Sequence, residues 1–359
     1  MKKFDTFFKT FGQLLGYHIK SVHWPKNLSI TLTRKCNARC IMCKVHANDT
    51  PENAADYKDM PDELFCKIEP LIRRASFISL GGSGEPSAAC HFVERVKRIR
   101  QLNPRAKLQI YTNGLAFSSL DFAQATAPLF DCIQISLNGV ASYEHITKGG
   151  SLEQIEKGLL NIQTVRGKYK KPKKVVVGFV LMKKNIADIV PAAMIAKKFG
   201  ADAISYKDLW VRDDSMKLES LRHNPDLAQQ IKKEIEKVVK TGFPVVCSIK
   251  SPWPQFHKKN MLRYTVRALP KIIFSRTFIK ELLPPCDKPW SFAQVFEGGN
   301  IYLCCSGSTM VGNLLKNDFE EIWHSPETMC YRNGLLTRNY YKDCAKCKHI
   351  AASPGAYER

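Results

Sequence analysis

Three cysteines near the N-terminus have the residue type and spacing of metal ligands. Cys36, Cys40 and Cys43 form a C-x3-C-x2-C loop directly after a short apolar segment. Thiolates in such a loop bind zinc or an iron–sulfur cluster. Structural zinc takes four protein ligands, and His46 could supply the fourth, whereas a cubane cluster on three thiolates keeps one iron open for another ligand. The loop by itself leaves both metals open.

Five further cysteines gather near the C-terminus, again with metal-ligand spacing. They are Cys286, Cys304, Cys305, Cys344 and Cys347. Adjacent side chains on a strand point to opposite faces, so we expect only one of Cys304 and Cys305 to face a metal, with a preference for Cys305. An iron–sulfur cluster and a four-cysteine zinc site both suit this set.

The 13 cysteines are not arranged as a secreted disulfide framework would be. The chain is long, and its first residues lack the apolar core and small-residue cleavage site of a signal peptide. The five cysteines outside the two groups are scattered, as buried thiols often are: Cys66, Cys90, Cys132, Cys247 and Cys330. The cysteine distribution predicts a reducing, cytoplasmic location.

The elements that must position these cysteines alternate between strands and helices. Strands are expected near 28–33, 108–114, 132–139, 173–182 and 202–209, and 77–86 is expected to be a buried strand that ends in a glycine-rich turn. Amphipathic helices are expected near 62–74, 90–102, 152–166 and 187–199, with another between the third and fourth strands. Short apolar strands alternating with amphipathic helices predict an α/β fold with a parallel sheet. We therefore expect an open or partial (β/α)6 barrel of the TIM type.

Polar and glycine-rich segments follow these strands, at the edge of a parallel sheet where ligands bind. They are Gly82–Pro86 (GSGEP), Thr112–Gly114 (TNG), Ile135–Gly139 (ISLNG) and Val180–Asn185, and Tyr143–Gly150 follows the fourth strand. Each segment is weak evidence alone. The cysteine loop, the GEP turn and the SLNG strand end, in this order on successive strands, are strong evidence together.

These motifs resemble the radical S-adenosylmethionine (SAM) superfamily over roughly residues 28–210. The resemblance implies that Cys36, Cys40 and Cys43 hold a [4Fe–4S] cluster whose open iron chelates the amino and carboxylate groups of SAM. The reduced cluster then cleaves SAM, and a 5′-deoxyadenosyl radical abstracts hydrogen from a substrate. It further implies contacts with SAM for a set of residues: Met42, Gly82, Gly84, Glu85, Pro86, Asn113, Ser136, Asn138 and Lys148.

The resemblance also suggests what some of these residues do. Glu85 and the glycine-rich turn would receive the methionyl amino group, and Ser136 would contact the ribose or the carboxylate. Lys148 stands where relatives often have arginine and could pair with the carboxylate as a point charge. Asn138 stands where many relatives have aspartate, so a charge-dependent role does not transfer to it.

The C-terminal segment resembles the SPASM/twitch extension of the same superfamily. The shared order is Cys286, Pro-Trp, a glycine turn, Cys304–Cys305, Gly-Asn-Leu, Ile-Trp and the pair Cys344 and Cys347. The resemblance implies one auxiliary [4Fe–4S] cluster, because no cysteine follows Cys347. Some relatives use a cysteine as a hydrogen donor or an electron route, a role for which Cys247 and Cys330 are candidates.

The two resemblances divide the chain into four expected regions. Residues 1–24 are expected to form an amphipathic helix, 25–210 the barrel, 211–283 a basic connecting segment and 284–359 the auxiliary-cluster domain. The first helix and the basic run at 257–283 could rest on an anionic membrane surface or an acidic partner, or pack on the barrel.

The formal net charge of +22 permits several acidic partners. No recognisable nucleic-acid-binding motif accompanies the charge, so we do not expect nucleic acid as a partner. No apolar run has the roughly 18–20 residues of a membrane span. We expect a cytoplasmic protein, with peripheral membrane association left open.

The sequence thus predicts a radical SAM enzyme with a peptide or small-molecule substrate. Peptide or protein maturation by oxidation, cross-linking or epimerisation is the first hypothesis. A radical dehydrogenase or epimerase of a sugar, aminoglycoside or lipid-linked molecule is the second, and RNA modification is the third. A non-enzymatic iron–sulfur or zinc scaffold is the fourth. An enzyme of this kind needs a low-potential electron donor of the flavodoxin or ferredoxin type.

Overall fold

The computed structural model describes residues 24–48, 57–247, 286–304, 309–345 and 347. The chain divides into two compact units, each described below by itself. The first unit comprises Met1–Ile30, Met60–Phe77 and Lys258–Arg359, and the second comprises Thr31–Asp59 and Ile78–His257. The expected N-terminal helix, the basic run and Cys305 lie outside the described residues. The domain boundaries expected from the sequence stay a prediction.

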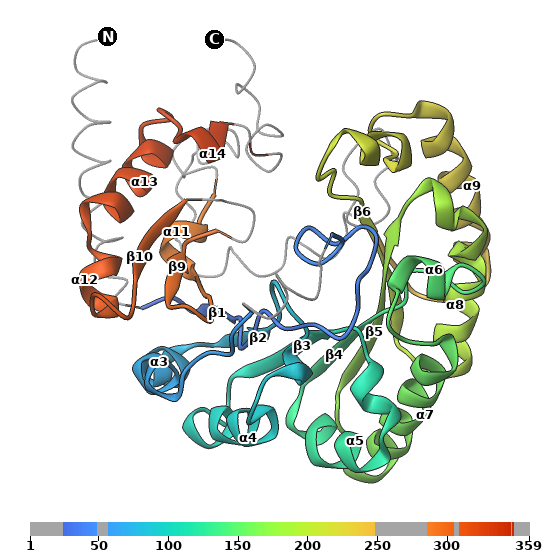
Figure 1. The fold of residues 1–359 in the computed structure, drawn as a ribbon, viewed down its shortest axis with the longest axis horizontal. Coiled ribbons are helices and arrows are strands. Elements are labelled where there is room, and N and C mark those ends of the chain that lie inside the picture. Colours follow the sequence, from blue (N-terminus) through green and yellow to red (C-terminus); the bar gives the residue numbers. More distant parts are fainter. Residues whose placement is uncertain (1–23, 49–56, 248–285, 305–308, 346, 348–359) are drawn as a thin grey trace, which may run out of the picture. The chain divides into compact units, whose positions relative to one another are not determined.

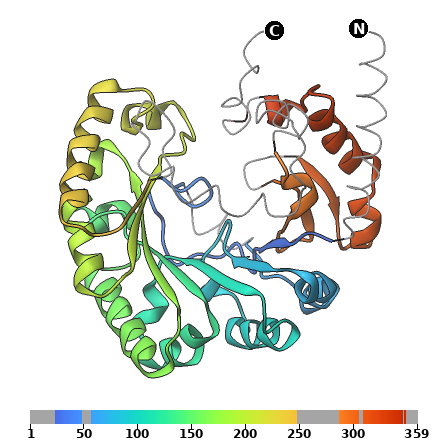
Figure 2. The same cartoon turned by 180° about the vertical axis from the view of Figure 1, so that it is seen from behind.

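The second unit is built on a curved sheet with helices on its outer side (Figures 1 and 2). Its strands are β2 (Phe77–Leu80), β3 (Lys107–Thr112), β4 (Cys132–Ser136), β5 (Lys174–Leu181), β6 (Ala203–Asp208) and β7 (Val245–Cys247). They lie side by side in chain order, and each pair from β3 to β7 is parallel. The helices are α4 (Phe92–Leu102), α5 (Leu120–Thr126), α6 (Tyr143–Thr147), α7 (Leu152–Tyr169), α8 (Ile189–Lys198) and α9 (Pro225–Lys240). Short 3-10 helices join them: η1 (Pro86–Ala88), η2 (Leu115–Ser118), η3 (Ala127–Leu129), η4 (Lys183–Asp188) and η5 (Asp214–Glu219).

The two faces of this sheet differ because side chains alternate along a strand. Ile110, Ile135 and Phe179 face the helices and are fully buried. Tyr111 and Ser136, one residue away from two of them, are exposed on the concave face. We call the concave face of β3–β6 the lumen. The curved parallel sheet confirms the predicted partial barrel, and β7 extends it by one strand.

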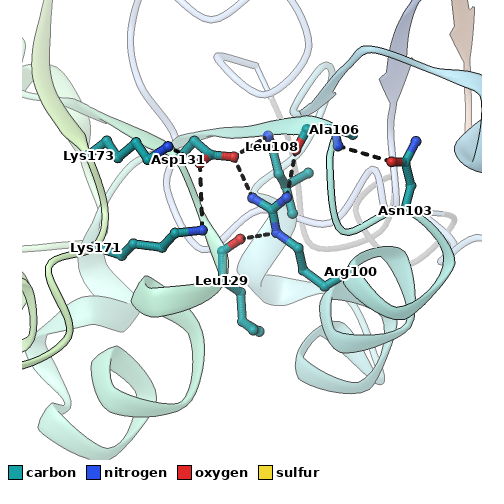
Figure 3. Close-up of polar contacts among 8 residues, drawn as sticks. All are labelled: Arg100, Asn103, Ala106, Leu108, Leu129, Asp131, Lys171 and Lys173. Carbon is teal, nitrogen blue, oxygen red and sulfur yellow. Dashed lines mark hydrogen bonds and ion pairs between the residues drawn. The ribbon is translucent and has the colours of Figure 1, made fainter.

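A charged network joins the amino ends of β3, β4 and β5 (Figure 3). Arg100 Nη2 lies 2.6 Å from Asp131 Oδ2, which also accepts the Leu108 N–H at 3.0 Å. Lys171 Nζ lies 3.7 Å from Asp131 Oδ1, and Arg100 donates to the Leu129 and Ala106 carbonyls. The network fixes the strands at the end of the sheet opposite to the cysteine loop.

The first unit has its own strands and core. β1 (Asn27–Ile30) pairs in parallel with β8 (Phe292–Val295), and β9 (Asn300–Tyr302) pairs antiparallel with β8 and with β10 (Met310–Asn313). Its helices are α3 (Asp62–Arg74), α11 (Lys288–Ser291), α12 (Phe319–Trp323), α13 (Pro326–Leu336) and α14 (Lys342–Ala345). Ile322 and Trp323 are buried, and the Trp24 ring stacks on Phe319 with centroids 5.2 Å apart.

The predicted elements are present within the described residues. The helix expected at 62–74 is α3, with the same bounds, and the strand expected at 173–182 is β5. In the part of the chain that the structure describes, no helix has both the length and the apolar character to span a membrane.

Candidate active site and auxiliary cysteine site

The cysteine loop is fixed to the carboxyl side of the sheet by backbone hydrogen bonds. The Arg39 N–H donates to the Lys148 carbonyl at 2.7 Å, and the Ile41 N–H donates to the Ile146 carbonyl at 2.9 Å. Arg212, in the segment after β6, donates from Nη1 to the Cys43 carbonyl at 3.1 Å. The loop is therefore held by segments that follow β4 and β6. Nothing in the sequence signalled Arg212, because it lies far from the loop along the chain.

The glycine-rich turn packs directly against the start of this loop. A Cβ at residue 84 would lie 2.5 Å from the Thr33 carbonyl oxygen and 2.6 Å from that of Lys35, so only glycine fits there. Gly82 has φ +132°, a conformation that favours glycine. Pro86 is buried at the first position of η1. These residues position the cysteine loop, and contact of their backbone with SAM stays a prediction.

Glu85 is buried and joins the turn to the end of β3. Its carboxylate accepts the Thr112 hydroxyl at 2.6 Å, the Asn113 N–H at 2.6 Å and the Ser87 hydroxyl at 2.7 Å. Burial raises the pKa of this carboxyl, while these donors act in the opposite direction. The group predicted to receive the methionyl amino group thus also supports the site structurally.

The next two strand ends supply one further contact to the loop and one exposed hydroxyl. Asn113 donates from Nδ2 to Asn37 Oδ1 at 2.6 Å, inside the cysteine loop. Ser136 is exposed at the end of β4. Asn138 is buried, and its Oδ1 accepts the Val180 N–H at 2.9 Å, so its amide fixes β4 to β5.

Lys148 lies beside the loop through its backbone, and its side chain is exposed. It ends α6 with φ +47°, and its carbonyl accepts the Arg39 N–H. Gly149 next to it packs against the Asn37 carbonyl so closely that a Cβ would clash. Contact of the Lys148 side chain with the methionyl carboxylate stays a prediction.

The three thiols of the loop come together in one half-buried place. Burial, with smaller contributions from Glu85 and Cys43, raises the pKa of Cys36 to about 11. Burial also raises the pKa of Cys40 to about 12, with contributions from Cys36 and Cys43. Thiolates crowded together with little water need a compensating positive charge. The thiols are close enough to act on one another electrostatically, although no three ligands among the described residues are already arranged around a metal position.

His46, the candidate fourth ligand of a zinc site, contacts the glycine-rich turn. Its Nε2 lies 2.6 Å from the Ser83 carbonyl oxygen, and its ring meets Tyr57 edge-on with centroids 5.0 Å apart. Its backbone N–H donates to Cys43 Sγ at 3.2 Å. His46 thus links the cysteine loop to the glycine-rich turn.

An apolar wall stands beside the loop. Met42 and Ile41 pack against Ile146, Met182 and other buried side chains, namely Leu209 and Met216. The wall joins the cysteine loop to the carboxyl ends of β5 and β6. It would exclude water from one side of a ligand bound there.

The cysteines of the first unit surround a small apolar core. Cys286, Cys344 and Cys347 pack around Trp290 and neighbouring side chains, which include Tyr331 and Leu335. Burial raises the pKa of Cys286, and Asp287, Cys347 and Cys344 add to the effect. Cys304 is half-buried just after β9, and Cys305 is outside the described residues. The choice between Cys304 and Cys305 therefore stays a prediction.

Two family models match this chain where the two cysteine sites lie. The model of the radical SAM superfamily matches residues 30–193, and the SPASM iron–sulfur cluster-binding domain matches residues 286–348. The chain carries a radical SAM domain followed by a SPASM domain. It is therefore an enzyme that uses a [4Fe–4S] cluster and SAM, and its SPASM domain is of a type that binds auxiliary iron–sulfur clusters.

Three known proteins are similar to this chain over most of its length. A tungsten-containing aldehyde ferredoxin oxidoreductase cofactor-modifying protein of Pyrococcus furiosus is 22% identical over 343 residues, covering 90% of this chain and 87% of the relative. The structure of Streptococcus suis SuiB with its precursor peptide SuiA has a TM-score of 0.60 at 16% identity, covering 91% of this chain and 70% of that one. Native anSMEcpe with AdoMet and the Cp18Cys peptide has a TM-score of 0.58 at 15% identity, covering 90% and 86%. The two structures share the fold.

The two cysteines considered as hydrogen donors lie in different units. Cys247 ends β7 and pairs in register with Tyr206, whose hydroxyl contacts the Ile189 carbonyl of α8. Paired residues share a sheet face, so Cys247 is on the helix side and not in the lumen. Cys330 is exposed on α13 in the SPASM domain. The placement of Cys247 gives that hypothesis no support.

Proposed function

We propose that this enzyme acts on a peptide or protein, which it oxidises, cross-links or epimerises after removing a hydrogen atom. The observation that carries the proposal is the placement of the loop with Cys36, Cys40 and Cys43 at the carboxyl side of a curved parallel sheet. When bound there, the cluster and SAM supply a 5′-deoxyadenosyl radical, which amino-acid side chains cannot provide.

In this proposal the residues around the loop bind and orient the cofactor. Lys148 supplies an exposed positive charge for the methionyl carboxylate, and Ser136 supplies a hydroxyl on the lumen side. Glu85 and Asn113 hold the end of β3 against the loop. Arg212 donates a hydrogen bond to the Cys43 carbonyl and thereby holds the segment after β6 against the cysteine loop, next to the apolar wall.

The SPASM domain holds the second redox site in this proposal. Cys286, Cys344 and Cys347 are three ligands, and Cys304 or Cys305 is the fourth. The domain would remove an electron from the substrate radical or anchor the substrate. A flavodoxin or ferredoxin is the proposed electron donor of the enzyme.

The peptide substrate is supported by two solved neighbours. SuiB is bound to the precursor peptide SuiA, and anSMEcpe is bound to a peptide, and both share this fold over at least 90% of the chain. A small-molecule substrate is the second candidate, because the Pyrococcus relative is described as modifying a cofactor and matches nearly the whole chain.

Iron content and SAM cleavage test the cofactor sites first. Anaerobic reconstitution should give about eight irons per chain, because each cubane holds four. Dithionite should then drive formation of 5′-deoxyadenosine. The triple variant Cys36→Ala, Cys40→Ala, Cys43→Ala should lose about four irons and all cleavage, whereas Cys132→Ala, on β4, should keep both. Full cleavage in the triple variant would exclude these ligands.

Deuterium transfer distinguishes the two substrate classes. Cells grown in heavy water supply a lysate that is divided by size into a peptide fraction and a small-molecule fraction. The enzyme is incubated with each fraction, SAM and dithionite, and 5′-deoxyadenosine is analysed by mass spectrometry. Deuterium should enter it from the peptide fraction. Transfer only from the small-molecule fraction would exclude the peptide proposal and support the second candidate.

A further inference from the structure

The lumen of the barrel carries a polar row that the cofactor residues do not explain. Strand register places Tyr111 beside Gln134, Ser136 beside Gly178, and Gly178 beside Ser205. Lys207 is two residues beyond Ser205 on β6, on the same face. The row therefore crosses the sheet from β3 to β6 on its concave side. Of these residues the sequence analysis singled out only Ser136.

Lys207 is the one positive charge in this row, and it is half-buried. Its Nζ lies 5.1 Å from the centroid of the Tyr111 ring, three strands away. Gly81 packs against the same ring, since a Cβ there would lie 3.1 Å from Tyr111 Cβ, which is a tight contact. The ring therefore lies under the ammonium group with Gly81 beside it. An aromatic face stabilises a cation but does not neutralise it.

No carboxylate among the described residues pairs with this ammonium. Burial lowers the pKa of Lys207, and no neighbouring acid opposes that effect. The adjacent acid, Asp208, is buried and pairs with Arg222. Because successive side chains alternate along β6, Asp208 points away from the lumen. A desolvated cation without an acidic partner costs free energy unless a ligand supplies the opposite charge.

We propose that Lys207 binds an acidic group of the substrate in the lumen, with Tyr111 under the ammonium group. A carboxylate suits the site, because one negative charge matches the single cation. On the proposed function, this group is an acidic side chain or the terminal carboxylate of the peptide. The neighbouring Gln134 and Ser205 supply amide and hydroxyl hydrogen-bonding groups on the same face. The inference rests on the proposed function for the identity of the substrate but not for the presence of the anion site.

Competitive acetylation of lysines tests the site in the reconstituted wild-type enzyme. Trace acetic anhydride labels neutral amines, and mass spectrometry gives the relative rate at each lysine. Lys157, exposed on α7, is the internal control. The probes are propionate, methyl phosphate and the neutral isostere propionamide at constant ionic strength, and SAM is tested separately.

Propionate should slow labelling of Lys207 about tenfold relative to Lys157. An anion beside an ammonium group raises its pKa by about one unit, which reduces the reactive neutral form by that factor. Propionamide should have no effect. Stronger protection by methyl phosphate would assign the anion site to a phosphate-bearing substrate and overturn the carboxylate. Absence of protection by either anion would overturn the site.

Protection by SAM alone, equal to that by propionate, would also overturn the inference, because the acidic group would then belong to the cofactor. Uncoupled SAM cleavage is measured on the same preparation. Cleavage without anion protection means that the proposed function stands and the inference fails. Anion protection without cleavage means that the anion site stands and the proposed function fails.

Discussion

Glu85 shows how one side chain at this site has both a structural and a candidate ligand role. The GEP turn suggested a residue that contacts SAM, and the structure shows a carboxylate already accepting hydrogen bonds from Thr112, Asn113 and Ser87. Gly84 is similar, since the space it leaves open is occupied by the backbone of the cysteine loop. At the scale of single residues, the motif residues hold one another in position. Their substitution should therefore affect loading of the cluster as well as contact with SAM.

The variant Glu85→Gln should weaken SAM binding about tenfold. The amide replaces one acceptor oxygen by a donor, so it cannot accept from Asn113 and Thr112 together, and a lost hydrogen bond of this kind costs about 1–2 kcal/mol. Equilibrium dialysis measures SAM affinity, and iron counting shows that the cluster is still loaded. Glu94→Gln, exposed on α4, is the matched control. Unchanged SAM affinity would show that the carboxylate is not needed for this arrangement.

The variant Gly84→Ala should lower the iron content of the radical SAM domain. The added Cβ would lie 2.5 Å from the Thr33 carbonyl oxygen, so the backbone that leads to Cys36 must move. Gly167→Ala is the control, because a Cβ at that position in α7 meets no atom within 4 Å. The control should instead stabilise the helix by about 0.5–1 kcal/mol. Equal iron content in the two variants would contradict the packing argument.

At the scale of elements, the strands and helices followed the apolar pattern closely. The predicted 62–74 helix and the strands near 108–114 and 173–182 are α3, β3 and β5. The pattern could not show what fixes the strands to one another. The Asp131 network does so at the amino ends of β3, β4 and β5 (Figure 3).

The variant Asp131→Asn should lower the free energy of unfolding by about 2 kcal/mol, because a charge-assisted hydrogen bond to Arg100 is lost. Burial raises the pKa of the Asp131 carboxyl, but Arg100 and the Leu108 N–H outweigh burial and lower it below its ordinary value. The stabilisation is therefore present above the pKa of the unfolded chain, near 4, and is lost as the pH falls through the lower folded pKa.

Urea unfolding of the wild type and of this variant at several pH values measures the difference. The gap should be constant near neutral pH and close in acid. Asp214→Asn, whose side chain is 91% exposed, is the control and should have little effect at any pH. A gap that persists in strong acid would mean that the loss comes from packing rather than from the charge.

At the scale of the whole molecule, the two cysteine sites lie in separate compact units. Each unit has its own strands, core and thiols, and the two domain matches coincide with the two sites. Metal binding contributes to folding where ligands gather only in the folded state. The two cofactor sites should therefore be separable by mutation.

The triple variant Cys286→Ala, Cys344→Ala, Cys347→Ala should lose about four of eight irons and keep SAM cleavage by the radical SAM domain. Formation of oxidised product, measured by mass spectrometry, should fall, because the second redox site that would take an electron from the substrate radical is absent. Iron analysis and the 5′-deoxyadenosine assay measure the other two effects. Cys330→Ala, exposed on α13, is the control. Loss of all iron would show that the two sites depend on each other.

The sequence by itself determined the alternation of strands and helices, the two cysteine groups and the motif at each strand end. These features depend on neighbouring residues and on short periodicities. Only the tertiary structure placed Lys207 over Tyr111, Arg212 on Cys43 and Cys247 on the helix side of β7. These placements relate residues that lie far apart along the chain, and they depend on the curvature and register of the sheet. Local sequence patterns do not encode either property, because both result from how many segments pack at once.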